Sequence, residues 1–186
     1  RIDVGDAVKN TSIGKNAGDA YTTGNSNIAV GYNALTETTT GEDNVAVGAY
    51  TLDANTTGSY ISAVGYNALS ANTTGISNDA FGYYALNQNT TGQYNTALGA
   101  RALQSNTTAN NNVAVGRDSL RLNSTGQYNV AIGAYTLDAN TTTDNNTACG
   151  YAALGQNTAN SNTAVGYAAL LVNTTGNSNV ALGVRA

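Results

Sequence analysis

The chain has 186 residues and a formal net charge of −4, with 10% charged residues, 21 Gly and no Pro, Met, Trp or His. The lack of His excludes a Ser-His-Asp triad, a Cys-His pair and His-ligated metals, and seven scattered basic residues form no patch for nucleic acid. No apolar run approaches the roughly 18 residues of a membrane span and no signal peptide is visible, so we expect no membrane insertion by this segment.

A 17-residue repeat fills the chain and is clearest at residues 24–40, G-N-S-N-I-A-V-G-Y-N-A-L-T-E-T-T-T. Gly24 is taken as position 1. A short fixed period dictates architecture before local propensity does. We therefore predict one repeat-array domain over residues 1–186, an all-β parallel β-solenoid or β-roll of eleven coils. The missing Met at residue 1 and the truncated last copy suggest a fragment of a longer fibre protein.

Each copy is predicted to begin with a strand at positions 4 to 8, N-x-A-x-G, which is Asn27 to Gly31 in the second copy. Alternate strand residues point to opposite faces, so Asn, Ala and Gly share one face while positions 5 and 7 share the other. Both faces are small or apolar. We expect one to line the coil and the other to pack on another copy of the protein.

The Gly at position 8 indicates a close approach of backbones that leaves no room for a side chain. These glycines are Gly31, Gly48, Gly65, Gly82, Gly99, Gly116, Gly133, Gly150, Gly166 and Gly183.

Positions 7 and 12 are predicted to form the hydrophobic core. Position 7 holds Val30, Val47, Val64, Phe81, Leu98, Val115, Ile132, Cys149 and Val165, and position 12 holds Leu35, Leu52, Leu69, Leu86, Leu103, Leu120, Leu137, Leu154 and Leu170, with Gly18 departing in the first copy. Cys149 is interpreted as a small buried hydrophobe, the alternative being a reactive thiol. A lone Cys allows no disulfide within the chain.

The second half of the repeat, x-x-A-L-x-x-N-T-T, is predicted to be a second short strand or an extended corner, because too few residues remain for a stable helix. The Asn at position 15 and the Gly that follows are expected to adopt left-handed corners, and the stacked Asn side chains to hydrogen-bond from coil to coil. Glycosylation is the alternative, since sequons occur at Asn10, Asn55, Asn72, Asn89, Asn106, Asn123, Asn140 and Asn173.

One copy is a residue short, between Asn157 and Asn162. A deletion inside a strand would flip every following side chain to the other face. We therefore expect the corner at Thr158 to Ser161 to tighten while the strands on either side stay in register.

Carboxylates such as Glu42, Asp43 and Asp144 are scattered at variable positions, so no catalytic residue, metal site or cofactor is predicted. Twelve Tyr residues are enriched at positions 3, 9 and 10. They are expected to pack on neighbouring coils; the alternative is a sugar-stacking or receptor surface that includes Tyr66, Tyr83 and Tyr84.

The segments N-I-A-V-G-Y-N-A-L at residues 27–35 and N-V-A-I-G at residues 129–133 resemble two related repeats. One is the N-x-A-I-G repeat of trimeric autotransporter adhesin heads, which form trimers of parallel β-rolls. The other is the N-T-A-x-G-Y-x-A-L-x-x-N-T-T-G repeat of bacteriophage tail fibres, often found with an endosialidase-type intramolecular chaperone. The second resemblance is closer, because it includes both halves of the repeat and covers nearly the whole chain.

The resemblance implies a non-enzymatic structural shaft of a homotrimeric fibre, in a virion tail fibre or an extracellular appendage. The alternative is an adhesin head or a module that binds a cell-surface glycan or protein receptor. A weaker alternative is an ice-binding solenoid, although its adjacent Thr residues, such as Thr56 and Thr57, would face opposite ways in a strand.

Overall fold

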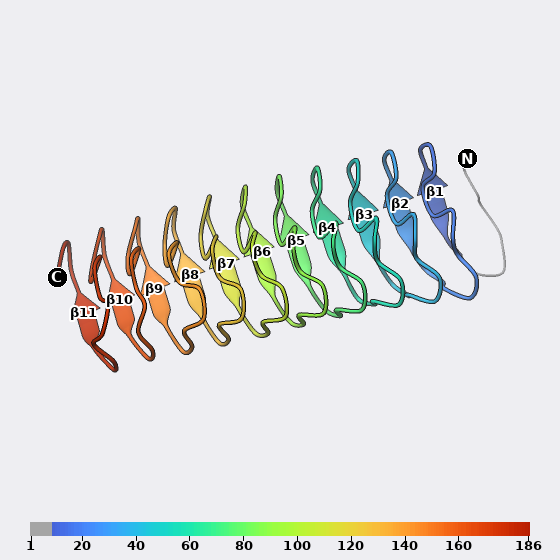
Figure 1. The fold of residues 1–186 in the computed structure, drawn as a ribbon. Helices are drawn as coiled ribbons and strands as arrows, with labels where there is room; N and C mark the ends of the chain where they lie inside the picture. The colour runs from blue at the N-terminus through green and yellow to red at the C-terminus, as the bar shows by residue number, and fades with distance from the viewer. Residues whose placement is uncertain (1–8) are drawn as a thin grey trace.

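The computed structural model describes residues 9–186, which form a rod of stacked coils with β1 at one end and β11 at the other (Figure 1). Each coil contributes one strand of three residues. The strands are β1 (Thr11–Ile13), β2 (Ile28–Val30), β3 (Val45–Val47), β4 (Ser62–Val64), β5 (Asp79–Phe81), β6 (Thr96–Leu98), β7 (Val113–Val115), β8 (Val130–Ile132), β9 (Thr147–Cys149), β10 (Thr163–Val165) and β11 (Val180–Leu182). The prediction of a parallel β-solenoid with a period of about 17 residues is confirmed.

All eleven strands belong to one parallel sheet in chain order, so each strand pairs only with those of the coils before and after it. The register places equivalent residues side by side, as for Ala46 with Ala63. Backbone bonds repeat at each step, for example from the N–H of Gly48 to the carbonyl of Val30 at 2.8 Å. The sequence period is therefore the step of the ladder.

The interior of each coil is narrow and is filled by small residues and one leucine. The Ala at position 6 points inward and is fully buried in β2 to β10, facing the leucine of position 12. The position-12 leucines of the second to ninth copies, Leu35 to Leu154, are fully buried, and Leu170 is partly buried against the same core. In the first coil Gly18 replaces the leucine, and the Tyr21 ring packs there instead, where burial raises the pKa of its phenol to about 12.

The core leucines adopt left-handed backbone angles, with φ of 50° at Leu35 and 49° at Leu86. This conformation costs a non-glycine residue about 1–2 kcal/mol, whereas full burial of a leucine side chain gains about 1.5–3 kcal/mol. Burial therefore exceeds the backbone cost, and the left-handed leucine is tolerated at every turn.

The second half of each coil contains no strand within residues 9–186; it is a series of turns whose backbone groups bond to the neighbouring coils. Left-handed residues occur at positions 3, 10 and 12, as at Tyr60, Asn67 and Leu69. The expectation of left-handed corners at the position-15 Asn and at position 1 is wrong: neither Asn72 nor Gly75 has a positive φ.

The position-15 asparagines are fixed by a buried side-chain ladder, which confirms the predicted coil-to-coil bonding. Asn72 donates from Nδ2 to Oδ1 of Asn55 at 2.9 Å, and Asn89 donates to Asn72 at the same distance. Each amide also donates to the carbonyl three residues on, as Asn72 does to Gly75 at 3.1 Å. The side chain is therefore held inward, and the corner angle is set by these bonds rather than by left-handed propensity.

A second ladder runs along the position-4 asparagines. Oδ1 of Asn95 accepts the backbone N–H of Asn112 at 3.0 Å, and Nδ2 of Asn95 reaches forward to the carbonyl of Ala109 at 2.8 Å. Each side chain therefore satisfies the backbone N–H of the next position-4 residue, which would otherwise be buried without a partner, and adds a second donor to a carbonyl of the next coil.

The position-8 glycines meet two constraints at once. Their φ values lie between 130° and 144°, outside the range that residues with a side chain adopt readily. A Cβ added to Gly31 would also lie 2.2 Å from the carbonyl oxygen of Gly48 in the next coil. No other residue fits this column without moving two backbones apart.

The short copy is accommodated in its corner, as predicted. β10 pairs with β9 in the common register, Ala164 opposite Ala148. Asn157 donates to the carbonyl of Ala159 two residues on, at 2.6 Å, instead of three residues on as elsewhere. The corner loses one residue and the ladder continues beyond it.

Candidate functional site

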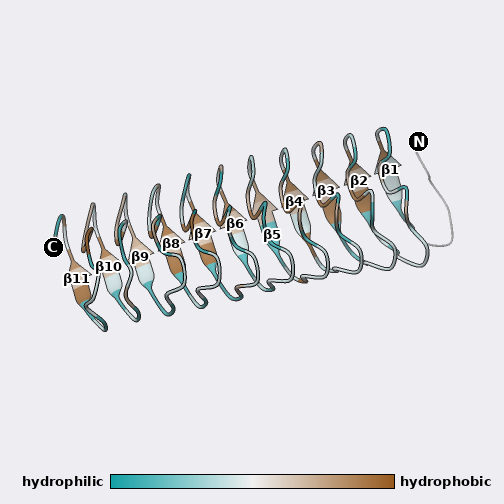
Figure 2. Ribbon diagram, viewed as in Figure 1, coloured by the Kyte–Doolittle hydropathy of each residue, from teal (hydrophilic) through white to brown (hydrophobic). Residues whose placement is uncertain are grey.

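The side chains at position 7 all lie on the outside of the single chain, in a line that we name the outer column. It consists of Ile13, Val30, Val47, Val64, Phe81, Leu98, Val115, Ile132, Cys149, Val165 and Leu182. Figure 2 shows hydrophobic colouring recurring on the strands along the rod. The exposed fractions are 40% for Phe81, 49% for Leu98 and 43% for Ile132. The prediction that these residues belong to the core is therefore wrong for the single chain.

The reason is the width of the coil. Because position 6 points inward, its neighbours at 5 and 7 must point outward. The inner space is filled by the Ala of position 6 and the side chain of position 4, which is Asn in most coils and the buried Ile61 in one, so no room is left for the position-7 side chain. Cys149 follows the same rule and is exposed, so its interpretation as a buried hydrophobe is also wrong.

Position 5 forms a second outward line beside the first, named the flank column. It consists of Thr11, Ile28, Val45, Ser62, Asp79, Thr96, Val113, Val130, Thr147, Thr163 and Val180. Unlike the outer column it admits polar residues and one carboxylate, Asp79, which is exposed. Only the outer column is apolar in every coil.

The tyrosines of positions 9 and 10 form two runs of neighbouring rings. Tyr66, Tyr83 and Tyr84 are brought together, with ring centroids 5.8 Å apart for Tyr66 and Tyr83 and 4.5 Å apart for Tyr83 and Tyr84. In the second run Tyr151 and Tyr167 stack at 5.4 Å with an angle of 9° between their planes. Only the pairs Tyr66–Tyr83 and Tyr151–Tyr167 stack face to face, and these four residues remain 44–55% exposed.

Cations cover several of the remaining faces. Lys15 lies 6.0 Å from the ring centre of Tyr32, and Arg117 lies 4.8 Å from that of Tyr135. A sugar stacks on a free aromatic face. The arrangement therefore favours the interpretation that these tyrosines pack coil upon coil.

Sequence reasoning missed an ionic cluster around Asp118, whose side chain is only 1% exposed. Arg101 donates from Nη2 to Asp118 Oδ2 at 2.8 Å, and Arg117 and Arg121 lie at 3.6 and 3.8 Å. Arg121 also donates from Nε to Asp138 at 2.9 Å. The signal was present in the sequence, because each hydrogen-bonded pair is separated by 17 residues and must occupy the same position of adjacent coils.

Two identical segments, residues 48–57 and 133–142, place an aspartate in different surroundings. Asp138 accepts a hydrogen bond from the Arg121 guanidinium, whereas Asp53 Oδ1 is buried without a hydrogen-bond partner. Burial, and to a smaller degree the nearby Glu37, raise the pKa of the Asp53 carboxyl, although backbone hydrogen bonds oppose the shift. No group of three potential metal ligands lies within residues 9–186.

The sequon asparagines are hydrogen-bonded inside the rod, and those from Asn55 to Asn140 are fully buried. An oligosaccharide cannot be attached to them in the folded chain. Of each Thr pair, the first hydroxyl donates to the next coil, as Thr73 does to the carbonyl of Thr90 at 3.1 Å, while the second, such as Thr74, is exposed. The two residues therefore do not form a flat double row.

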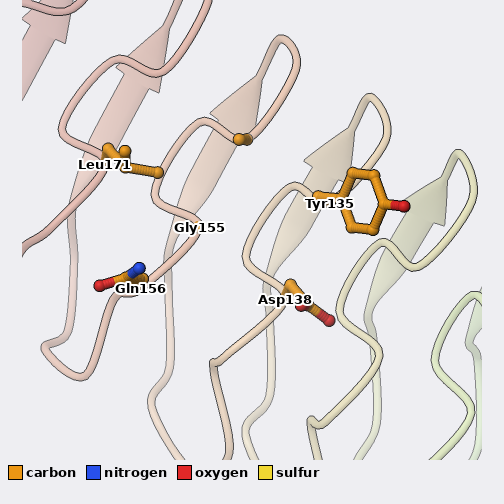
Figure 3. Close-up of a pocket in the computed structure, with 6 residues that line it drawn as sticks. Tyr135, Asp138, Gly155, Gln156 and Leu171 are labelled. Atoms are coloured by element: carbon orange, nitrogen blue, oxygen red, sulfur yellow. The ribbon is translucent and has the colours of Figure 1, made fainter.

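A surface hollow of about 170 Å³ lies over Gly155, between Asp138 and Leu171 (Figure 3). Position 13 carries a side chain in the neighbouring coils, whereas at Gly155 the Leu171 side chain reaches to 3.1 Å from where a Cβ would lie. The Tyr135 and Asp138 side chains point away from Gly155 toward the preceding coil (Figure 3). Its polar groups do not converge, and the hollow lacks the arrangement of a ligand site.

Within residues 9–186, no helix is long and apolar enough to cross a membrane. Comparisons with protein-family models, with curated proteins and with solved structures found no match to this chain.

Proposed function

We propose that this chain is a non-enzymatic structural shaft of a homotrimeric fibre, as in a bacteriophage tail fibre or another extracellular appendage. The observation that carries the proposal is the outer column, which is apolar in all eleven coils and is exposed at seven positions and half-buried at Val30, Val47, Val64 and Val115. Large continuous apolar surfaces on soluble proteins mark interaction sites. The similarity of the repeat to those of tail fibres and adhesin heads supports three copies as the assembly.

The energy of covering this column is comparable to the cost of bringing copies together. Burying a Val, Leu or Ile side chain fully gains about 1.5–3 kcal/mol, so covering one that is 40–49% exposed, as Phe81 and Leu98 are, gains roughly 1 kcal/mol per coil. Summed over the seven exposed and four half-buried side chains of the column, the gain approaches about 10 kcal/mol per chain, which is comparable to the 4–15 kcal/mol that association costs. The flank column adds to this.

The rest of the rod supports a structural role. The Asn ladders, the Gly column and the Leu column make every coil depend on its neighbours, so stability accumulates along the rod. Every tyrosine of positions 9 and 10 has a neighbouring ring whose centre lies no more than 6.0 Å away.

The experiment is light scattering at micromolar concentration on the wild-type chain and on two variants. The wild type is expected at three times the chain mass of 18.8 kDa. A Leu98→Glu, Ile132→Glu double variant places charges in the outer column and is expected to be a monomer that keeps its β-sheet circular dichroism. Leu122→Glu, a similarly exposed leucine at 39% outside both columns, is the matched control and should remain trimeric. A wild-type monomer would overturn the proposal.

A further inference from the structure

Three tyrosines at position 3 stand apart from the runs of rings at positions 9 and 10. Tyr60, Tyr94 and Tyr128, which we name the tyrosine row, are 55–61% exposed. Within residues 9–186, no other aromatic ring and no cation lies against any of them. The tyrosine row therefore offers aromatic surface to a ligand.

Tyrosine is an unusual residue at position 3, because the backbone there is left-handed. The φ angles are 62° at Tyr60, 58° at Tyr94 and 57° at Tyr128. Most other coils have Ser, Asn or Asp at this position, and Asn and Asp adopt the left-handed conformation more readily than bulky residues do. The core leucines offset the same strain by complete burial, whereas these tyrosines are exposed. Strain that brings no packing benefit is typical of a functional site.

The backbone holds the tyrosine row at a fixed spacing. The N–H of Tyr60 donates to the carbonyl of Glu42 at 3.1 Å, and the N–H of Tyr94 donates to the carbonyl of Ile76 at 3.2 Å, in each case in the preceding coil. The three tyrosines occur in alternate coils. Since neighbouring strands lie about 4.8 Å apart, the tyrosine backbones recur at intervals of about 10 Å along the rod.

The surface around the tyrosine row is polar and uncharged. No charged residue occurs in the corner segments of these coils, from position 17 of one copy to position 3 of the next, which are residues 57–60, 74–77, 91–94, 108–111 and 125–128. The position-17 threonines of these segments are exposed, and so is Asn111. Asp79 follows one of the segments, and Asp43 and Asp144 occupy the corresponding segments one coil beyond each end of the row. Hydroxyl and amide groups suit the hydroxyls of a sugar, whereas these carboxylates disfavour an acidic ligand.

We propose that the tyrosine row binds a neutral, extended β-1,4-linked polysaccharide that runs along the rod. In such a chain successive sugar rings face in alternate directions, so the same orientation recurs at every second ring, at about the interval of the tyrosines. Each tyrosine stacks on the apolar face of every second sugar, while the Thr, Asn and Gln side chains bond the sugar hydroxyls. A protein partner fits less well, because it needs an apolar centre and Ile76 is the only large aliphatic residue in the five segments.

Isothermal titration calorimetry with cellohexaose and with chitohexaose tests the proposal. Both probes are long enough to reach all three tyrosines, and the pair shows whether the site takes a glucan or an N-acetylated chain. The wild type is expected to bind at least one of them. The corresponding disaccharide, which reaches one tyrosine, and the α-1,4-linked maltohexaose should bind at least about tenfold more weakly. Absence of binding of both hexasaccharides at millimolar concentration, or equal affinity for the disaccharide, would overturn the proposal.

A triple variant removes the rings. Tyr60→Asn, Tyr94→Asn, Tyr128→Asn introduces the residue that Asn111 already provides at position 3, so the variant should fold at least as stably as the wild type. Its affinity for the hexasaccharide should fall at least about tenfold. The matched control replaces three tyrosines of the other runs by Asn, which are Tyr32, Tyr151 and Tyr167 with exposed fractions of 41–49%. An equal loss of affinity in the control would overturn the assignment of the site.

A rearranged variant tests the spacing. Tyr94→Ser combined with Ser77→Tyr keeps three exposed rings at position 3 but places them about 5 and 14 Å apart. Its affinity should fall as far as that of Tyr94→Ser alone. Wild-type affinity in the rearranged variant would refute the match between tyrosine and sugar intervals.

Light scattering separates this site from contacts between copies. The triple Asn variant should keep the wild-type mass, because the tyrosine row lies outside the outer and flank columns. A lower mass would show that the row joins copies of the chain and would overturn the proposal. A wild-type monomer that binds the hexasaccharide would overturn the trimeric shaft and leave this site intact.

Discussion

Truncating one asparagine of the position-4 ladder, by Asn112→Ala, should destabilise the rod far more than its size suggests. Asn112 is fully buried. Its Oδ1 accepts the backbone N–H of Asn129 at 2.9 Å and the Asn129 Nδ2 at 3.2 Å, while its Nδ2 donates to the carbonyl of Gly126 at 2.9 Å. Its Nδ2 also donates to Oδ1 of Asn95 at 3.3 Å, so the alanine variant loses four side-chain bonds.

The magnitude follows from what each partner retains. The Gly126 carbonyl still accepts from Asn123, and the Asn129 amide still donates to the Thr143 carbonyl. Only the Asn129 N–H is left buried without a partner, which costs about 1–3 kcal/mol. The remaining lost bonds are worth about 0.5–1.5 kcal/mol each, so we expect a loss of about 3 kcal/mol.

The assay is urea unfolding followed by circular dichroism, with native-state hydrogen exchange of the Asn129 amide as a local measurement. Thr125→Ala is the control, because this side chain is exposed and makes no hydrogen bond within the described residues; it should cost less than about 0.5 kcal/mol. Equal stability of the two variants, together with an unchanged Asn129 exchange rate, would refute the ladder argument.

The chain also contains a natural interruption of this ladder. Ile61 occupies position 4 and offers no side-chain oxygen to the N–H of Asn78, whereas Asn78 offers one to the N–H of Asn95 at 3.0 Å. The Asn78 amide should therefore exchange faster than the Asn95 amide, and Ile61→Asn should slow it. Unchanged exchange at Asn78 in that variant would contradict the explanation.

Gly116→Ala should cost more than about 3 kcal/mol in urea unfolding, because its φ is 130° and a Cβ would lie 2.6 Å from the next backbone; a cost below 1 kcal/mol would contradict the account of this column. The pKa of the Asp53 carboxyl is raised in the folded chain above its ordinary value near 4, so ionisation of Asp53 lowers the stability of the rod as the pH rises above about 4. Asp53→Asn should therefore melt at a higher temperature than wild type at pH 7, and this gain should vanish by pH 3. A gain that does not change with pH would contradict the argument. Inserting Gly after Ala159 should change stability by less than about 1 kcal/mol, whereas insertion between Ala131 and Ile132 breaks the strand register and should cost far more; equal melting temperatures would disprove the assignment of strand and corner.

The architecture was predictable because the repeat places chemically demanding residues at a fixed spacing. A Gly in every coil, with Asn and Ala at fixed offsets before it, leaves few folds other than stacked parallel strands. The short copy was predictable for the same reason, since Ala164 and Gly166 resume the pattern after the missing residue.

The faces of the strand were harder to assign. Val30 and Ala29 are equally regular in the sequence, and the usual expectation that the larger apolar residue is buried points to Val30. The narrow coil reverses this, because Ala29 fits inside and Val30 does not. Left-handed backbone angles at residues such as Leu35 were not predictable either, since local propensity opposes them and only tertiary burial compensates.

The ionic cluster was predictable from the 17-residue spacing of its pairs, whereas the outward direction of the position-7 side chains was not. Arg101 and Asp118 are distant in sequence and adjacent in the structure. The repeat period identifies such contacts between coils, whereas the direction of a side chain depends on the width of the coil.

The central claim, that other copies cover the outer column, is tested most directly by the reaction rate of the wild-type Cys149 thiol. Its side chain is exposed in the single chain, so a monomeric rod should react with a thiol reagent about as fast as the urea-unfolded chain does. The account predicts that the native protein at micromolar concentration reacts at least about a hundredfold more slowly than the unfolded chain. The reason is that the thiol is accessible only in the small fraction of molecules whose interface has opened. Native and unfolded rates of equal size would contradict it.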